Sequence, residues 1–214
     1  MNKATSRGQL LIISAPSGAG KTSLIRALIE QDRRIEVSVS HTTRPQRPGE
    51  VEGINYFFVP PETFQSMKEN NAFFEWATVF GHFYGTSTAQ LDARLSQGAD
   101  VILEIDWQGA QQVRSLLPDS AWIFILPPSV GSLKTRLRER GQDTDATINL
   151  RMQAAQDEMS HCGEADYLVI NDAFDTALVE LQAIISAARL RTGRQQAAHT
   201  ALLKGLLTPE TTTP

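Results

Sequence analysis

LLIISAPSGAGKT, residues 10–22, begins with four consecutive aliphatic side chains and ends with a lysine and a threonine. A short aliphatic run predicts a buried strand, and the glycines after it predict a tight turn into a helix. A strand, a glycine-rich turn and Gly20-Lys21-Thr22 at the start of a helix form the pattern of a phosphate-binding loop, or P-loop. The first position of the pattern is Ala15 instead of glycine, so the backbone at Ala15 must avoid positive φ.

The P-loop predicts a site for a nucleoside triphosphate. Backbone N–H groups of the loop and of the helix N-terminus would surround the phosphates. Lys21 would reach the β- and γ-phosphates, and the Thr22 hydroxyl would ligate Mg²⁺. An ordinary glycine-rich turn explains the glycines, but not a lysine and a threonine at the mouth of the helix. We expect the nucleotide to be bound by Ala15, Pro16, Ser17, Gly18, Ala19, Gly20, Lys21 and Thr22.

Further apolar runs and helical patterns predict the rest of the fold. The apolar runs after the first are residues 101–106, 121–126 and 167–171. The helical patterns are residues 20–31, 88–97, 108–117, 130–139, 144–161 and 173–191. Continuous apolar strands that alternate with amphipathic helices indicate an α/β fold, in which a parallel P-loop sheet is flanked by helices on both faces.

Two segments interrupt this alternation. Residues 37–87 resemble short strands rich in aromatic residues, with turns at Arg47-Pro48-Gly49 and at Gly53, which predicts a small β-rich insertion. Residues 136–161 begin with a polar, arginine-rich stretch in which Gly141 predicts a hinge. We expect a core of residues 8–36, 88–135 and 162–191, the insertion at 37–87, a helical arginine-bearing lid at 136–161, and a C-terminal helix with a disordered tail at 192–214.

Composition and charge exclude several classes of protein. The chain has 214 residues, a net charge of −4 and a pI near 5.6, and no basic stripe favours nucleic acid. The N-terminus is short and polar, and no apolar run approaches the length of a membrane span. The single cysteine, Cys162, cannot form an internal disulfide, which fits a reducing compartment. We therefore expect a cytoplasmic protein with no nucleic-acid or membrane partner.

Two acids stand at the end of the apolar run at residues 101–106. Glu104 and Asp106 alternate with Leu103 and Ile105, so both should point to one face of the strand. Ligands bind at the carboxyl ends of strands in open α/β sheets, where an acid commonly serves Mg²⁺ directly or through water. Asp106 would equally suit the N-cap of the helix that follows. Both roles for Asp106 are compatible.

The insertion and the strand end carry the most specific motifs. They are Ser40-His41-Thr42-Thr43-Arg44-Pro45-Gln46-Arg47-Pro48-Gly49-Glu50, Gly53 with Tyr56, Glu75-Trp76, Tyr84-Gly85-Thr86, and Glu104-Ile105-Asp106-Trp107-Gln108-Gly109. In this order behind the P-loop, they resemble the motifs of bacterial guanylate kinases over about residues 10–191. The resemblance implies a nucleoside monophosphate kinase that transfers the γ-phosphoryl group of ATP directly to GMP, and to dGMP, with Mg²⁺ as cofactor. Such an enzyme serves purine nucleotide metabolism and GMP recycling.

The resemblance also implies how GMP is recognised. Arg44 and Arg47 can hold the dianionic phosphate, and Tyr56 and Tyr84 match the family's tyrosines that donate to it. Glu75 can accept hydrogen bonds from guanine N1–H and from the 2-amino group, a donor pair that adenine lacks. The hydroxyls of Ser40 and Thr86 can donate to guanine O6. Many family members have serine where this chain has Thr86. The implied GMP site comprises Ser40, Arg44, Arg47, Tyr56, Glu75, Tyr84, Thr86, Glu104 and Asp106.

The same resemblance assigns residues to the ATP side. Arg136, Arg140 and Arg151 match the arginines that close over ATP and stabilise the charge of the transferring phosphoryl group. Asn171 matches a residue near the adenine, although a helix cap before Ala173 is an equal alternative. Catalysis would then be positioning and charge neutralisation with no covalent intermediate. The implied catalytic residues are Lys21, Arg44, Arg136, Arg140 and Arg151, and the implied metal site uses Thr22 and, through water, Asp106.

Other interpretations compete with this one. A ribose bisphosphate kinase of the same fold would use another acceptor, but Ser40, Glu75 and Thr86 favour guanine. Guanylate-kinase-like domains of membrane scaffolds bind phosphopeptides and have generally lost a working P-loop, which this chain keeps. A GTPase switch would need an Asn-Lys-x-Asp run, which the sequence lacks. The leucine-rich C-terminal helix can pack on the core or on a second subunit, so a homo-oligomer is a further expectation.

Overall fold

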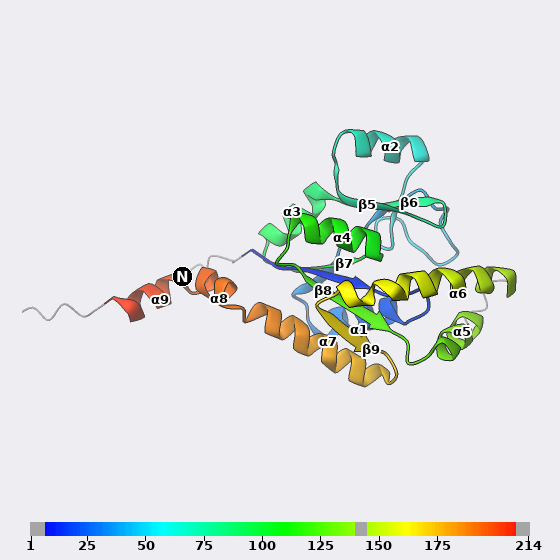
Figure 1. The fold of residues 1–214 in the computed structure, drawn as a ribbon. Helices are drawn as coiled ribbons and strands as arrows, with labels where there is room; N and C mark the ends of the chain where they lie inside the picture. The colour runs from blue at the N-terminus through cyan, green and yellow to red at the C-terminus, as the bar shows by residue number, and fades with distance from the viewer. Residues whose placement is uncertain (1–6, 140–144, 209–214) are drawn as a thin grey trace, which may run out of the picture.

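The computed structural model describes residues 7–139 and 145–208, and its main sheet has five parallel strands in the order β2-β7-β1-β8-β9 (Figure 1). The strands are β1 (Leu10–Ser14), β2 (Ile35–Val37), β7 (Asp100–Glu104), β8 (Ala121–Leu126) and β9 (Tyr167–Ile170). The helices connected to this sheet are α1 (Lys21–Gln31), α3 (Thr88–Ser96), α4 (Trp107–Leu116), α5 (Val130–Glu139), α6 (Asp145–Ser160), the 3₁₀ helix η1 (His161–Glu164) and α7 (Phe174–Arg189). The predicted α/β class with a parallel sheet is confirmed.

Strand β1 explains why the first apolar run has no polar alternation. Leu11 and Ile13 pack into one core cluster with α1 and α7, whereas Leu10 and Ile12 pack into another with α3 and α4. Because helices cover both faces of the sheet, successive side chains of a central strand are all buried. The short strand β2 was not predicted, because its middle residue is Glu36 and it forms no apolar run.

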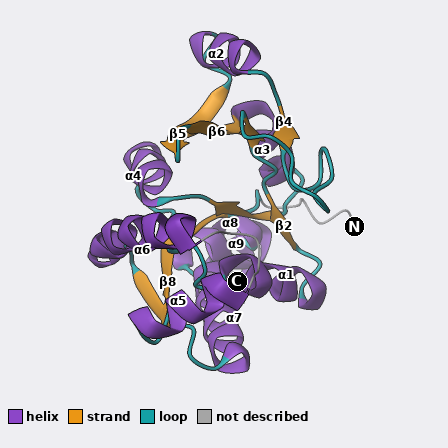
Figure 2. Ribbon diagram, turned by 90° about the vertical axis from the view of Figure 1, so that its right-hand side faces the viewer, coloured by secondary structure: helices purple, strands orange, loops and turns teal. Residues whose placement is uncertain are grey.

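The insertion forms a second sheet, which lies apart from the main sheet in Figures 1 and 2. Its strand order is β4-β3-β6-β5, with β3 (His41–Thr42), β4 (Phe57–Phe58), β5 (Phe73–Val79) and β6 (His82–Ser87). The prediction of strands alone was incomplete, because this segment also contains helix α2 (Pro61–Glu69). Phe64 of α2 is fully buried and stacks on Phe73, with ring centroids 4.4 Å apart. The clustered aromatic residues are therefore the core of a small α+β unit.

Two helices follow α7, where the sequence predicted one. They are α8 (Thr192–Ala198) and α9 (Thr200–Leu207), separated at His199. Figure 1 shows both extending away from the main sheet. The predicted tail from residue 209 onward lies outside the described residues, as do Arg140 and the hinge predicted at Gly141. In the part of the chain that the structure describes, none of the helices has the length and apolar character needed to cross a membrane.

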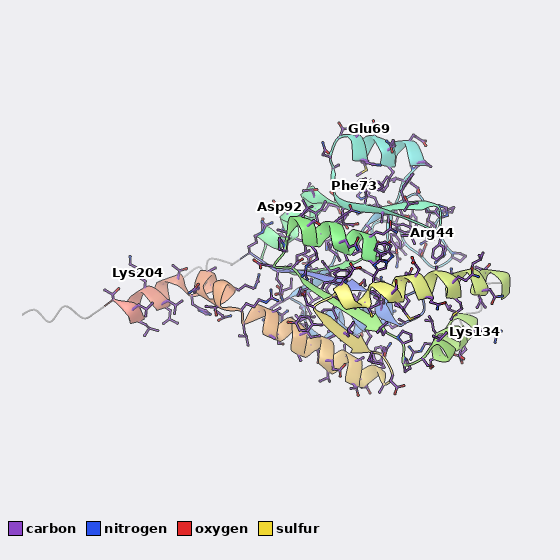
Figure 3. The ribbon with its side chains drawn as sticks, viewed as in Figure 1. Arg44, Glu69, Phe73, Asp92, Lys134 and Lys204 are labelled. Carbon is purple, nitrogen blue, oxygen red and sulfur yellow. The ribbon has the colours of Figure 1, made fainter. Side chains whose placement is uncertain are left out.

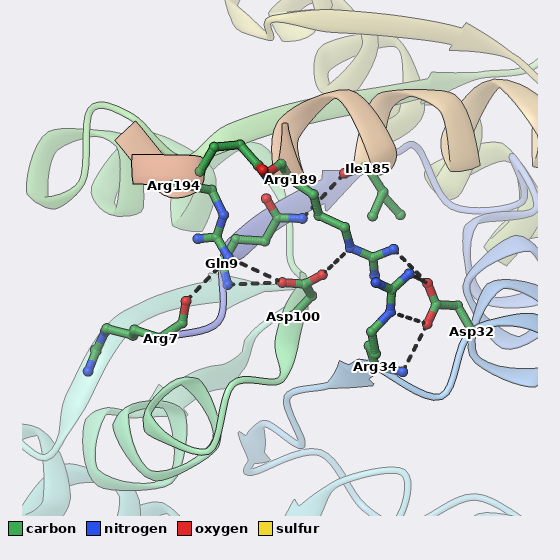
Figure 4. Close-up of polar contacts among 9 residues, drawn as sticks. Arg7, Gln9, Asp32, Arg34, Asp100, Ile185, Arg189 and Arg194 are labelled. Atoms are coloured by element: carbon green, nitrogen blue, oxygen red, sulfur yellow. Dashed lines mark hydrogen bonds and ion pairs between the residues drawn. The ribbon is translucent and has the colours of Figure 1, made fainter. Parts of the chain in front are cut away.

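An arginine near the end of α7 joins that helix to two acids at the far end of the sheet from the P-loop (Figure 4). Arg189 Nε donates to Asp100 Oδ2 at 2.5 Å, and Nη1 donates to Asp32 Oδ2 at 2.6 Å. Asp100 also accepts from the backbone N–H of Gln9. Hydrogen bonds from Arg34 hold the pKa of Asp32 well below its usual range, against the effect of burial and with the help of Arg189.

We expect Arg189→Met to lower the free energy of unfolding by about 2 kcal/mol at pH 7, because it leaves the buried Asp100 without its closest cation. Arg34→Met is the matched control, since that side chain is 68% exposed and its ion pair should contribute less than about 1 kcal/mol. The pKa of Asp32 is lowered, first by Arg34 and also by Arg189, so the stabilisation from these two pairs is present above about pH 4 and is lost as the pH falls further. Urea unfolding at pH 7 and pH 3 checks both points; equal effects of the two variants would contradict the assignment.

Candidate functional site

The P-loop joins β1 to α1 and depends on two glycines. Gly18 and Gly20 have φ of 94° and 95°, a region that favours glycine. A Cβ on Gly20 would also lie 2.3 Å from Asn171 Nδ2. The expectation for Ala15 is confirmed: among the described residues, the non-glycine positions with positive φ are Asn71 and Phe80. The loop thus tolerates alanine at its first position.

Two of the predicted ATP-side residues hydrogen-bond to the backbone of the P-loop. Asn171 Nδ2 donates to the carbonyl oxygen of Ala19 at 2.7 Å, and Arg136 Nη1 donates to the same oxygen at 3.4 Å. Arg136 Nη2 also donates to the carbonyl of Asn171 at 2.9 Å. The alternative role of Asn171 as a helix cap is wrong, because Ala173 occupies that position and α7 has no side-chain cap. The two side chains instead tie the P-loop to β9 and α5.

Helix α6, in the segment predicted to be a lid, contacts the P-loop through a residue that the sequence did not single out. Glu158 Oε2 accepts a hydrogen bond from the backbone N–H of Ser17 at 3.1 Å. Burial raises the pKa of Glu158, and the nearby positive charge of Lys21 acts against this rise. An acid on a surface helix has no distinguishing sequence pattern, so only the fold identifies it. Arg151 lies in the same helix.

The two acids at the end of β7 have different partners. Glu104 Oε1 accepts a hydrogen bond from the Thr22 hydroxyl at 2.6 Å. Asp106 caps α4, where its carboxylate accepts from Gly109 N–H at 3.0 Å, as predicted. Burial raises the pKa of Asp106, and the Gly109 N–H and the charge of Lys21 partly offset this rise. Both acids therefore lie beside the first residues of α1.

On the insertion, Arg44 is held in place by an acid. Its Nη2 donates to Glu50 Oε1 at 2.6 Å, and Glu50 Oε2 accepts from the backbone N–H of Arg47 at 2.8 Å. Burial would lower the pKa of Arg44, but Glu50 and Tyr84 raise it above its usual value. Figure 3 shows Arg44 on the side of the insertion nearer the rest of the chain. Glu50 belongs to a predicted motif, but its residue type and spacing did not indicate this role.

Two tyrosines extend this polar surface. The rings of Tyr56 and Tyr84 meet edge to face, with centroids 5.8 Å apart, and the Arg44 guanidinium lies 5.4 Å from the Tyr56 centroid. Burial, together with the negative charges of Glu104 and Tyr84, raises the pKa of Tyr56 to about 12. Tyr56 therefore keeps its hydroxyl proton at neutral pH, as a donor to a phosphate must.

The predicted base-reading pair is buried between β5 and β6. Glu75 and Thr86 are partners in the register of these antiparallel strands, and the Thr86 hydroxyl donates to Glu75 Oε1 at 2.5 Å. Glu75 is 3% exposed and Thr86 is fully buried, and Ser40, just before β3, is buried as well. Burial raises the pKa of Glu75 to about 7, and the charge of Asp106 adds to this rise while the Thr86 hydrogen bond opposes it.

The two halves of the site lie next to each other, since the side-chain amide of Gln112 in α4 donates to the Trp76 carbonyl in β5 at 2.7 Å. Charges also act across this region. The charge of Lys21 lowers the pKa of Asp106, that of Asp106 raises the pKa of Glu75, and that of Glu104 raises the pKa of Tyr56. The structure thus brings together the P-loop, the end of β7 and the insertion. The site can hold two anionic groups at once, one on the backbone N–H groups of the P-loop and one on the arginine and tyrosines of the insertion.

Comparison with known proteins finds the same family that the sequence motifs resemble. The family model described as Guanylate kinase matches residues 7–188. The guanylate kinase of Hahella chejuensis is 55% identical over 204 residues, which cover 95% of this chain and 98% of that protein. That of Saccharophagus degradans is 57% identical over 203 residues, with 95% and 99% covered. The crystal structure of guanylate kinase from Anaplasma phagocytophilum, 33% identical, matches 89% of this chain and 90% of its own with a TM-score of 0.75.

Proposed function

This chain belongs to the guanylate kinase family, and we propose that its site residues divide between a GMP site on the insertion and an ATP site at the P-loop. The chain is an enzyme, a nucleoside monophosphate kinase that phosphorylates GMP with ATP as the donor. The observation that carries the division is the buried pair of Glu75 and Thr86, beside an arginine and two tyrosines and opposite the P-loop. We propose residues 37–87 as the GMP-binding unit, residues 136–161 as the lid, and residues 8–36, 88–135 and 162–191 as the core.

On the acceptor side, we propose that the phosphate of GMP is bound by Arg44, Arg47, Tyr56 and Tyr84. Glu50 already orients Arg44 and the Arg47 backbone, so little rearrangement of the loop is needed. Glu75 accepts from the two adjacent guanine donors, and the hydroxyls of Ser40 and Thr86 serve O6, for which Thr86 turns the single proton that it gives to Glu75 Oε1 toward the base. Glu104 and Asp106 line the space between base and P-loop. Adenine offers Glu75 neither of these two donors and would leave the buried carboxylate with only its contact to Thr86, which favours GMP and dGMP.

On the donor side, we propose that residues 15–22 and Asn171 bind ATP. The pairing of the Thr22 hydroxyl with Glu104 fits Mg²⁺, because hard oxygen ligands suit this ion, which keeps several waters and uses one or two carboxylates. Thr22 would hold the ion directly and Asp106 through water. Bound there, Mg²⁺ would neutralise charge on the β- and γ-phosphate oxygens.

Transfer then needs alignment and charge neutralisation, with no covalent intermediate and no strong base. Lys21 stabilises the β- and γ-phosphates, and Arg44 holds the attacking phosphate in line. We propose that Arg136, Arg140 and Arg151 neutralise charge as the lid closes. Arg136 donates a hydrogen bond to the Ala19 carbonyl of the P-loop, which supports a role on the donor side. Closure would also exclude water as a competing acceptor.

We further propose that the enzyme acts in the cytoplasm, in purine nucleotide metabolism, without nucleic-acid or membrane partners, and that it forms homo-oligomers through its C-terminal helices. Leu202, Leu206 and Leu207 of α9 are 57%, 71% and 78% exposed. Exposed leucines clustered on one short helix favour burial against another subunit.

Steady-state kinetics of Tyr84→Phe tests the division of the site. We expect the KM for GMP to rise about tenfold, which corresponds to the loss of one hydrogen bond to a charged group, while the KM for ATP stays within about twofold. A variant with an unchanged KM for GMP, or with a raised KM for ATP alone, would place the acceptor phosphate elsewhere.

A further inference from the structure

The first turn of helix α4 lies directly against the buried carboxylate of the insertion. A Cβ on Gly109 would lie 2.7 Å from Glu75 Oε2 and 3.4 Å from Glu75 Cδ. The first distance is shorter than a nonbonded contact between carbon and oxygen allows. The carboxylate therefore occupies the space that any side chain at position 109 would fill.

The backbone next to Glu75 is attached to the same helix. The side-chain amide of Gln112 donates to the Trp76 carbonyl at 2.7 Å, and its oxygen accepts from the Trp76 N–H at 3.3 Å. Gln112 thus pairs with Trp76 as an adjacent strand would. These two bonds fix strand β5 against α4 immediately beside Glu75, while Thr86 holds the carboxylate from the other strand.

Helix α4 is itself anchored to the core and has little freedom to withdraw. Ala110 and Val113 are fully buried in a core cluster. The Trp107 ring stacks on the His161 ring, with centroids 3.6 Å apart and planes 8° apart. An added methyl group at position 109 should therefore displace the end of the Glu75 side chain and leave the helix where it is.

We propose that Gly109 is a positioning residue for GMP: its missing side chain, together with the bonds from Gln112, sets where the Glu75 carboxylate meets the guanine base. The inference rests on the proposed role of Glu75. It makes the core helix α4, which the implied GMP contacts do not include beyond its cap, a determinant of acceptor specificity.

The backbone at Gly109 does not itself require glycine. This residue lies within α4 and is absent from the glycines with positive φ, and alanine is the better helix former. Replacement by alanine should leave the fold intact and act through the contact with Glu75. Gly205→Ala in α9 is the matched control, because a Cβ there meets nothing within 4 Å.

The test is the kinetics of Gly109→Ala with GMP and with ATP. We expect kcat/KM for GMP to fall about tenfold or more, with the KM for ATP unchanged within about twofold, and Gly205→Ala to match the wild type. The decisive readout is the same substitution in a Glu75→Asp background. The shorter side chain draws the carboxylate away from the added methyl, so Gly109→Ala should there cost less than about threefold.

A merely structural role predicts the same loss from Gly109→Ala in both backgrounds, and that result would overturn the inference. So would a Gly109→Ala enzyme whose kcat/KM for GMP equals that of the wild type. If in either case Glu75→Gln is still impaired with GMP, the proposed function of Glu75 stands and only the role of Gly109 fails. An unimpaired Glu75→Gln enzyme would refute both.

Discussion

Lys21→Met should lower kcat for GMP phosphorylation by about three orders of magnitude or more. The lysine stands at the start of α1, and removal of a single preorganised donor to a charged transition state costs on the order of 10²–10³-fold. The full positive charge of Lys21, placed beside the transferring phosphates, should contribute at least as much. The P-loop account therefore places its largest single effect at this residue.

The fold should not depend on Lys21. Its amino group makes a 3.3 Å hydrogen bond to the carbonyl of Ile105, and no core cluster includes it. Thermal unfolding should occur within a few degrees of the wild type. Lys204→Met, an exposed site on α9 far from the P-loop (Figure 3), makes the same chemical change and should leave kcat unaltered. A Lys21→Met enzyme that melts normally and keeps most of its activity would show that the P-loop assignment is mistaken.

Glu75→Gln should lower kcat/KM for GMP by roughly 100-fold, equivalent to about 3 kcal/mol. The amide can accept only at its oxygen and would point a donor at a guanine donor in a buried site. Discrimination against AMP should weaken in the same variant, because AMP no longer leaves a buried carboxylate without the two guanine donors. Glu75→Gln keeps the side-chain volume, so its effect separates charge from packing.

The pH dependence of the wild type provides a second readout of Glu75. Burial raises its pKa to about 7, and only the carboxylate form accepts from both guanine donors. In the free enzyme, kcat/KM for GMP should therefore fall as the pH decreases through about 7, while the KM for ATP changes less. This acid limb should be absent in Glu75→Gln. Persistence of the full limb in the variant would assign it to another group, such as the phosphate of GMP itself.

The fold was predictable where burial leaves a pattern in the sequence. The central strands appeared as apolar runs because helices cover both faces of the sheet, as Leu10 to Ile13 show. Strand β2 is three residues long with a glutamate in the middle and gave no such run. Helix α2 was not predicted, because its buried residue, Phe64, lies in an aromatic-rich segment that was interpreted as short strands.

The residues of the site that belong to sequence motifs were predictable, and the residues that orient them were not. The P-loop and the acceptor residues carry their chemistry in residue type and spacing, and the structure brings them to one region. The residues that orient them act through contacts between distant segments. Glu158 contacts Ser17 across 141 positions and Gln112 contacts Trp76 across 36. Such partners have no local sequence pattern. Gly109 stands at the end of a predicted motif, but its contribution is an absent side chain, and only the fold shows that this space belongs to Glu75.

The central claim is that a buried carboxylate on the insertion selects guanine as the acceptor. Its most direct test measures ADP formation from ATP and Mg²⁺ with GMP, dGMP, AMP, CMP, UMP and ribose bisphosphate offered separately, to the wild type and to Glu75→Gln. We predict that the wild type uses GMP and dGMP, with kcat/KM at least about 100-fold above that for AMP, and that the ratio collapses in the variant. Equal turnover of GMP and AMP by the wild type, or a ratio unchanged by Glu75→Gln, would contradict the account.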